Sequence, residues 1–263
     1  MPGDATSKLQ KLLAQAGLGS RRDMEQWISA GRITVNGVTA QLGARVGAQD
    51  LVKVDGRVLQ AAEPARLPQV LLYHKPEGEI VSRDDPAGRP SAFEKLPRLH
   101  GAKWVAVGRL DFNSCGLLVF TTSGELANRM MHPRFEIERE YAVRVMGQLQ
   151  PQHLRQLTQG IDLDDGVARC DSVELRGGEG ANQWCHVVLK EGRNRIVRRI
   201  FERLGFTVSR LMRVRFGIIE LPPRLKRGHT QELSAAETRR LLGWLDAAPP
   251  SSPPRRSGRG AQA

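Results

Sequence analysis

The sequence predicts an α+β protein with two domains, and three observations support this prediction. Residues 6–60 are basic and are interrupted at short intervals by glycines. Residues 61–68 contain two prolines, which interrupt regular hydrogen bonding, so we expect a linker there. Residues 69–246 alternate between apolar strands and amphipathic helices. The remaining segment, 247–263, is rich in proline, serine and arginine, has almost nothing to bury, and is expected to be disordered.

The composition favours a polyanionic partner. The chain has 263 residues and a formal net charge of +12, which suits nucleic acid first and an anionic membrane second. No apolar run is long enough for a membrane span, and the N-terminus lacks the pattern of a signal peptide. The cysteines are odd in number and lack metal-ligand spacing, so we expect a cytoplasmic protein without a disulfide framework. They are Cys115, Cys170 and Cys185.

Two helices and two strand–turn units are predicted in the first domain. Leucines at helical spacing place one helix over residues 8–17, and Ser20 is suited to cap a second helix over residues 21–30. Asn-Gly and Asp-Gly pairs are expected to form tight turns after short strands at residues 32–37 and 51–56. The polar sides of these elements carry basic residues that suit RNA phosphates, namely Lys8, Lys11, Arg21, Arg22 and Arg32.

The second domain is predicted to begin with a strand from Val70 that breaks into a turn at Pro76. The apolar run over residues 104–107 predicts another strand, and a further strand is expected to start at Leu117. A helix should follow and end at Pro133. Later elements are a strand from Tyr141, a strand over residues 186–189, and a helix after Gly192 with Val197, Ile200, Phe201 and Leu204 on its apolar face.

The turn between residues 107 and 117 presents one carboxylate, Asp111. A lone aspartate in such a position is usually only a turn residue. The surrounding sequence changes this interpretation, because Gly-Arg-Leu-Asp followed closely by Gly-Leu-Leu resembles the catalytic motif of pseudouridine synthases. These enzymes convert a uridine in RNA into its C-glycoside isomer. The resemblance implies that Asp111 is the catalytic carboxylate.

Two further motifs resemble the same family. Tyr141 stands at the start of the strand after the helix, where the family has a tyrosine that stacks on the target base. Arg139 stands two residues earlier, where many relatives have lysine. Glu-Gly followed by Val-Arg-Arg is similar to the third family motif, whose first arginine pairs with the catalytic aspartate. The resemblance therefore implies a base-stacking role for Tyr141 and an ion pair between Arg198 and Asp111.

Residues 6 to about 53 closely resemble the S4 RNA-binding domain, and the chain as a whole is similar to the family of ribosomal RNA pseudouridine synthases formed by RsuA, RluB, RluE and RluF. Several details are most similar to its large-subunit members. The resemblance implies a mixed, largely antiparallel sheet with flanking helices, and large-subunit ribosomal RNA as the partner of a monomeric enzyme. The RNA-binding residues would be Lys8, Arg21, Arg22, Arg32, Asn36, Lys75, Arg109, Arg193 and Arg195.

Two other classes of protein fit the sequence less well. A non-catalytic S4-type ribosome-binding factor would not need Asp111, which is present. A zinc deaminase would need Cys-x-x-Cys spacing, which the chain lacks. Isomerisation needs no cofactor or metal. The sequence leaves open whether Asp111 attacks C1′ or removes a C2′ proton, and which uridine is modified.

Overall fold

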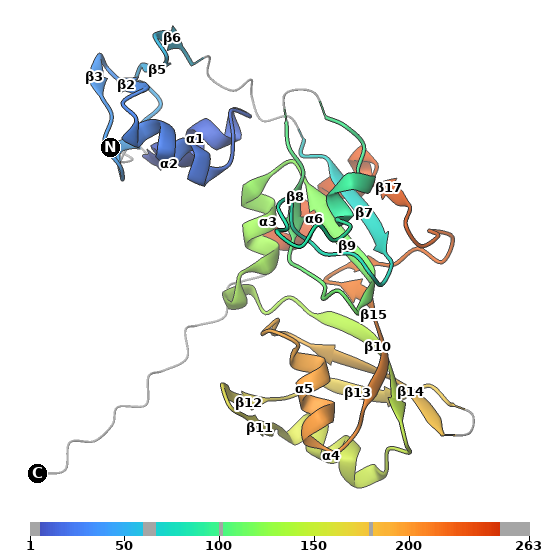
Figure 1. Cartoon of the computed structure of the whole chain (residues 1–263). Coiled ribbons are helices and arrows are strands. Elements are labelled where there is room, and N and C mark those ends of the chain that lie inside the picture. The colour runs from blue at the N-terminus through green and yellow to red at the C-terminus, as the bar shows by residue number, and fades with distance from the viewer. Residues whose placement is uncertain (1–5, 60–66, 100–101, 179–180, 248–263) are drawn as a thin grey trace, which may run out of the picture. The chain divides into compact units, whose positions relative to one another are not determined.

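A computed structural model describes residues 6–59, 67–99, 102–178 and 181–247 (Figure 1). The chain divides into two compact units. The first comprises residues 1–68 with the short segments 98–104 and 122–124, and the second comprises the rest. Most of the expected linker, residues 61–66, and the expected tail from residue 248 lie outside the described residues. The predicted domain boundaries therefore stay predictions.

The first unit packs two short helices against small sheets. Helices α1 and α2 form as predicted, and Ser20 caps α2 by accepting a hydrogen bond from the backbone N–H of Asp23. The Asn-Gly turn is also confirmed, with φ of 52° at Asn36 and 85° at Gly37. The core of the first unit consists mainly of leucine, isoleucine, methionine and valine side chains. The elements are β1 (Ser7–Lys8), α1 (Leu9–Gln15), α2 (Arg21–Ser29), β2 (Ile33–Val35), β3 (Val38–Thr39), β4 (Arg45–Val46), β5 (Val52–Val54) and β6 (Arg57–Val58).

The second unit is built on one mixed sheet. In the described residues its strand order is β13-β14-β10-β15-β9-β7-β17, with β8 beside β9 and β16 beside β15. All pairs are antiparallel except β9 with β15, so the predicted mixed, largely antiparallel sheet is confirmed. The strands are β7 (Val70–Lys75), β8 (Val105–Val107), β9 (Cys115–Thr121), β10 (Arg139–Met146), β13 (Ser172–Leu175), β14 (Asn182–Leu189), β15 (Val208–Phe216), β16 (Ile219–Glu220) and β17 (Thr230–Glu232).

Two groups of helices cover different parts of this sheet (Figure 1). Helices α3 (Gly124–Met131) and α6 (Ala235–Ala247) share a core with β7, β8 and β9. Helices α4 (Pro151–Gln159) and α5 (Ile196–Arg203) contact β13 and β15 respectively. A separate hairpin of β11 (Ile161–Leu163) and β12 (Gly166–Ala168) lies against α5.

Candidate active site

Asp111 lies in the turn that connects β8 to β9, as predicted. Gly108 opens this turn with φ of +80°, a conformation that favours glycine. Leu110 is buried, whereas Phe112 is 40% exposed. Asp111 itself is half-buried. The turn thus has an apolar anchor on one side of the carboxylate and accessible residues on the other.

The backbone of this turn is held by donors from several parts of the unit. The carbonyls of Asp111 and Ser114 accept hydrogen bonds from Lys75 Nζ at 3.2 and 2.9 Å. Of the two carbonyls between them, that of Phe112 accepts a hydrogen bond from the Gly78 N–H at 2.9 Å. Arg198 donates to the Asn113 carbonyl at 2.7 Å. Four consecutive carbonyls are therefore engaged, and the position of Asp111 is fixed without using its side chain.

Lys75 lies in the interior of the second unit. We expected an RNA contact, but its side chain is fully buried and its ammonium donates only to backbone carbonyls, including that of Pro76 at 2.9 Å. Burial lowers the pKa of Lys75, and the nearby charge of Glu79 partly offsets this effect. The end of β7 turns into the interior beside the turn that carries Asp111, so the structure offers no support for the RNA contact, which stays a prediction.

Arg198 reaches the same turn from α5, but it does not form the expected ion pair. Among the described residues, no Arg198 nitrogen lies within 4.0 Å of a carboxylate oxygen. Instead the guanidinium bridges the carbonyls of Asn113 at 2.7 Å and Val208 at 2.8 Å, while Nε has no partner. Burial lowers the pKa of Arg198, and the charge of Asp111 opposes that shift. The attraction between the two groups thus acts without direct contact.

Sheet register brings Tyr141 toward the turn. Tyr141 pairs with Arg213 across β10 and β15, and Arg213 pairs with Gly116 across β15 and β9. Arg213 is buried and donates from Nε to the Leu117 carbonyl at 2.8 Å. Burial lowers the pKa of Arg213, and the neighbouring Tyr141 phenol partly offsets this. A tyrosine, a buried arginine and the strand that follows Asp111 therefore lie in one row.

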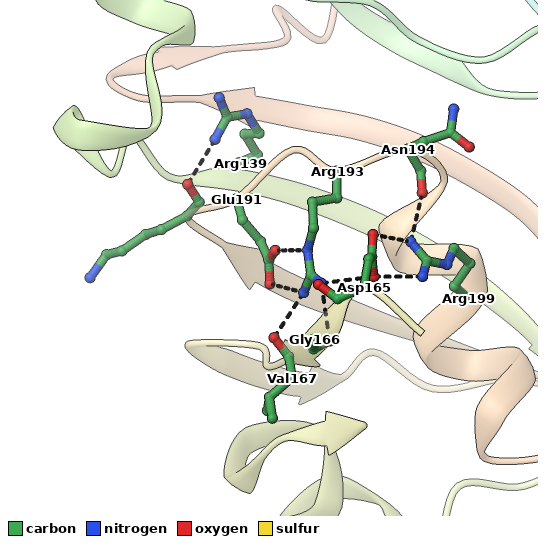
Figure 2. A network of polar contacts seen from close by, with 9 residues as sticks. Arg139, Asp165, Gly166, Val167, Glu191, Arg193, Asn194 and Arg199 are labelled. Carbon is green, nitrogen blue, oxygen red and sulfur yellow. Dashed lines mark hydrogen bonds and ion pairs between the residues drawn. The ribbon is translucent and has the colours of Figure 1, made fainter. Parts of the chain in front are cut away.

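The loop before α5 is fixed by a second polar network (Figure 2). Arg193 donates to the carboxylate of Glu191, to the Asp165 carboxylate at 2.9 Å, and to the backbone carbonyls of residues 165–167. Arg199 forks onto the same Asp165 carboxylate at 2.6 and 2.9 Å. Arg199 holds the pKa of Asp165 at about 2. This network ties the β11–β12 hairpin to the helix that carries Arg198.

The predicted RNA-binding residues fall into two groups. Besides Lys75, three of them are engaged within the protein: Arg193 in the network above, Arg32 in an ion pair with Asp55, and Asn36 in hydrogen bonds with Asp50 and Leu51. A direct RNA contact by these three would first require an internal bond to break. The others are exposed and, within the described part of the chain, have no ion pair closer than 3.9 Å: Lys8, Arg21, Arg22, Arg109 and Arg195.

Sequence reasoning missed two buried arginines near Tyr141. Arg213 stands in a strand of alternating character and gives no local signal of its burial. Arg139 was identified only as the residue where many relatives have lysine, but it is buried and donates to the carbonyls of Ile137 and Lys190 at 2.9 and 3.0 Å. Both guanidinium groups lie over the ring of Phe216, at 4.9 and 5.0 Å. The described residues contain no cluster of three or more side chains suited to a metal ion.

Family comparison agrees with this geometry. The model of the RNA pseudouridylate synthase family matches residues 69–203. The chain belongs to this family. A second model, that of the S4 domain, matches residues 7–52 of the synthase. Both resemblances that the motifs predicted are therefore confirmed.

Individual relatives and a solved structure extend the comparison. The synthase is 53% identical over 250 residues to the ribosomal large subunit pseudouridine synthase B of Salmonella typhimurium. The aligned region covers 94% of the synthase and 86% of that protein. The protein of the same name from Escherichia coli strain K12 is 52% identical with the same coverage. A crystal structure of a pseudouridylate synthase matches with a TM-score of 0.62 and 23% identity, covering 89% of the synthase and 99% of that chain, which supports the fold.

Proposed function

We propose that the synthase isomerises one or more uridines of large-subunit ribosomal RNA to pseudouridine, with Asp111 as the catalytic carboxylate. The observation that carries this proposal is the fixed turn: four consecutive carbonyls are engaged by Lys75, Gly78 and Arg198, while the carboxylate of Asp111 is left free of ion pairs among the described residues. A residue whose backbone is held in this way is positioned before the substrate arrives, and its carboxylate stays available to it. The relatives' names support ribosomal RNA as the substrate.

The chemistry requires no group beyond the chain and its RNA. The target uracil leaves its stack, which costs a few kcal/mol. Asp111 then acts at the sugar, either by attacking C1′ or by removing a C2′ proton. The N-glycosidic bond breaks, the uracil rotates, and C5 bonds to C1′. In the first route the bond from Asp111 to C1′ breaks as C5 attacks, and in the second route Asp111 returns the proton to C2′. C5 then loses its proton and N1 gains one, so the composition of the substrate is unchanged.

Tyr141 and Arg198 support this chemistry in different ways. Tyr141 is 8% exposed and offers a ring for stacking on the extruded base, an interaction of roughly 1–3 kcal/mol. Arg198 fixes the turn through the Asn113 carbonyl, and its positive charge interacts favourably with the charge of Asp111. A direct ion pair between Arg198 and Asp111 would require the turn to close further when RNA binds.

The S4 domain is proposed to dock the RNA. Its exposed basic residues Lys8, Arg21 and Arg22 are suited to phosphate contacts. Arg109 and Arg195 would contact the RNA near the catalytic turn.

No helix among the described residues is long and apolar enough to cross a membrane. We further propose that the synthase works as a cytoplasmic monomer.

Mapping of pseudouridine tests the function directly. The full chain is incubated with an unmodified transcript of large-subunit ribosomal RNA, and pseudouridines are located by chemical labelling and reverse transcription. We expect stops at defined uridines, and none with a small-subunit transcript. Tight binding of the large-subunit transcript without any new pseudouridine would favour a non-catalytic S4-type assembly factor instead.

A further inference from the structure

One face of the sheet in the second unit carries an uncompensated pair of arginines. Arg144 on β10 and Arg210 on β15 are direct cross-strand partners. Like charges in this position lower stability. No carboxylate among the described residues pairs with either side chain; Arg144 bonds through Nε to the Ser209 hydroxyl at 3.0 Å, and Arg210 is exposed. The outer nitrogens of both guanidinium groups are therefore available to an anion.

A neighbouring arginine on the same face, Arg215, has an acidic partner. Arg215 pairs with Glu140 in the register of the same two strands, and its Nε donates to that carboxylate at 2.9 Å. His186 reaches the other oxygen of Glu140 at 2.8 Å. Acidic partners are thus present along this face, but none neutralises Arg144 and Arg210. This contrast favours an anionic partner outside the protein for the two arginines.

An aromatic side chain completes the row. Trp184 on β14 is the cross-strand partner of Arg144 on the other side, so Arg210, Arg144 and Trp184 follow one another across three strands. Trp184 is half-buried, and with Arg144 and Asn182 it lines an open hollow of about 360 Å³. Cationic groups beside an aromatic ring suit single-stranded nucleic acid, because phosphates bind the arginines and a base stacks on the ring.

The row lies close to the catalytic turn. Arg198 bridges the carbonyl of Asn113, in that turn, and the carbonyl of Val208. Arg210 follows Val208 by two residues on β15, across an irregularity in the pairing with β10. An RNA strand with its target nucleotide at Asp111 would therefore reach the row within a few nucleotides.

We propose that Arg210, Arg144 and Trp184 form a binding surface for the single-stranded RNA that flanks the target uridine. This inference rests on the proposed function, since it assumes an RNA substrate at Asp111. The arginines bind one or two phosphates next to the target, and Trp184 stacks on a flanking base. The surface contributes to affinity and to the choice of site, and it takes no part in bond breaking.

The test measures RNA affinity against salt concentration for the full chain and an unmodified ribosomal RNA fragment. The variants are Arg210→Ala and Arg144→Gln, which keeps a donor for Ser209. Each should weaken binding and reduce the magnitude of the salt slope by about 0.7, the value for one contact to a single strand. The single-turnover rate at saturating RNA should stay near that of the unchanged protein. Trp184→Ala should weaken binding roughly fivefold or more, and Trp184→Phe should restore most of it.

Arg239→Ala is the matched control, because it removes the same charge from an exposed position on α6. If Arg210→Ala and Arg144→Gln bind with the slope of this control, the surface does not contact RNA and the inference is wrong. Loss of folding in both variants would also overturn it, since removal of a repulsive pair should preserve or raise the melting temperature. These outcomes differ from failure of the proposed function, in which the unchanged protein binds RNA but forms no pseudouridine.

Discussion

Lys75 is the residue whose chemistry most constrains the catalytic turn. A buried ammonium is unfavourable unless its three N–H groups find acceptors. Here the acceptors are the carbonyls of Pro76, Asp111 and Ser114. The charge is therefore stabilised only when the turn has the conformation seen in the structure. In this structure Lys75 therefore supports the backbone of the turn that carries Asp111.

Replacement of Lys75 by methionine should lower activity without lowering RNA affinity. Methionine fills most of the space but donates no hydrogen bond, so the Ser114 carbonyl loses its donor at a cost of about 1–3 kcal/mol. Displacement of the turn by about 1 Å would reduce the single-turnover rate roughly 100-fold. Denaturant unfolding, RNA binding and single-turnover kinetics provide the three readouts.

Lys95→Met serves as the control, because Lys95 is exposed in the same unit. It should leave all three measurements nearly unchanged. If Lys75→Met instead weakened RNA binding and flattened its salt dependence while the rate at saturation stayed normal, Lys75 would be an RNA contact after all.

At the scale of elements, the parallel contact between β9 and β15 decides how the two parts of the sheet meet. Gly116 faces Arg213 across this contact with φ of +104°. A Cβ atom at Gly116 would lie 2.3 Å from the Arg213 carbonyl oxygen and 2.6 Å from its nitrogen. Gly116 is the second residue of β9, the strand that follows the catalytic turn. Both its backbone conformation and the space around it therefore require glycine.

Gly116→Ala should destabilise the synthase by about 2–6 kcal/mol, from backbone strain and overpacking together. Gly243→Ala is the matched control in the interior of α6, where a Cβ meets no atom within 4 Å. It should stabilise the protein by about 0.5–1 kcal/mol through helix propensity. Equal unfolding midpoints for the two variants would show that β9 and β15 can separate without cost.

The β11–β12 hairpin acts through α5. Asp165 joins Arg193 and Arg199, so Asp165→Asn should loosen the hairpin and the helix that carries Arg198. We expect a lower unfolding midpoint and a single-turnover rate reduced by roughly tenfold or less, with RNA affinity retained. Asp164→Asn, which changes the neighbouring exposed carboxylate, is the control.

The stability effect of Asp165 should also depend on pH. Its pKa is about 2 in the folded protein and 3.8 without its partners. A lowered carboxyl pKa stabilises the fold above the unperturbed value, and this contribution is lost as the pH falls toward 2. The difference in unfolding free energy between the unchanged protein and Asp165→Asn should therefore be smaller at pH 3 than at pH 7. A constant difference would mean that the ion pairs contribute nothing.

At the scale of the whole molecule, local signals predicted the elements well. Ser20 as a cap, the Asn36–Gly37 turn and the strands around Asp111 depend on short stretches of sequence, and the structure has them. The mixed sheet followed from resemblance to the family rather than from hydrophobic pattern. Pattern alone does not order strands that are distant in the sequence.

The side-chain partners at the site could not be predicted in the same way. The burial of Lys75 depends on β7 pairing with β9, and that of Arg213 depends on β15 lying between β9 and β10. Arg198 was expected to meet a carboxylate and meets two carbonyls instead. In each case a charged residue takes its role from segments far away in the sequence, so its own neighbours gave no indication.

The central claim is that Asp111 performs the isomerisation, and Asp111→Asn tests it most directly. The substitution keeps the size of the side chain and removes its charge and nucleophilicity. Single-turnover formation of pseudouridine and RNA affinity are measured on the same ribosomal RNA fragment, with the exposed Asp162→Asn as control. We predict that Asp111→Asn binds RNA as tightly as the unchanged protein and forms no detectable pseudouridine. Pseudouridine formation at a near-normal rate by Asp111→Asn would contradict the account.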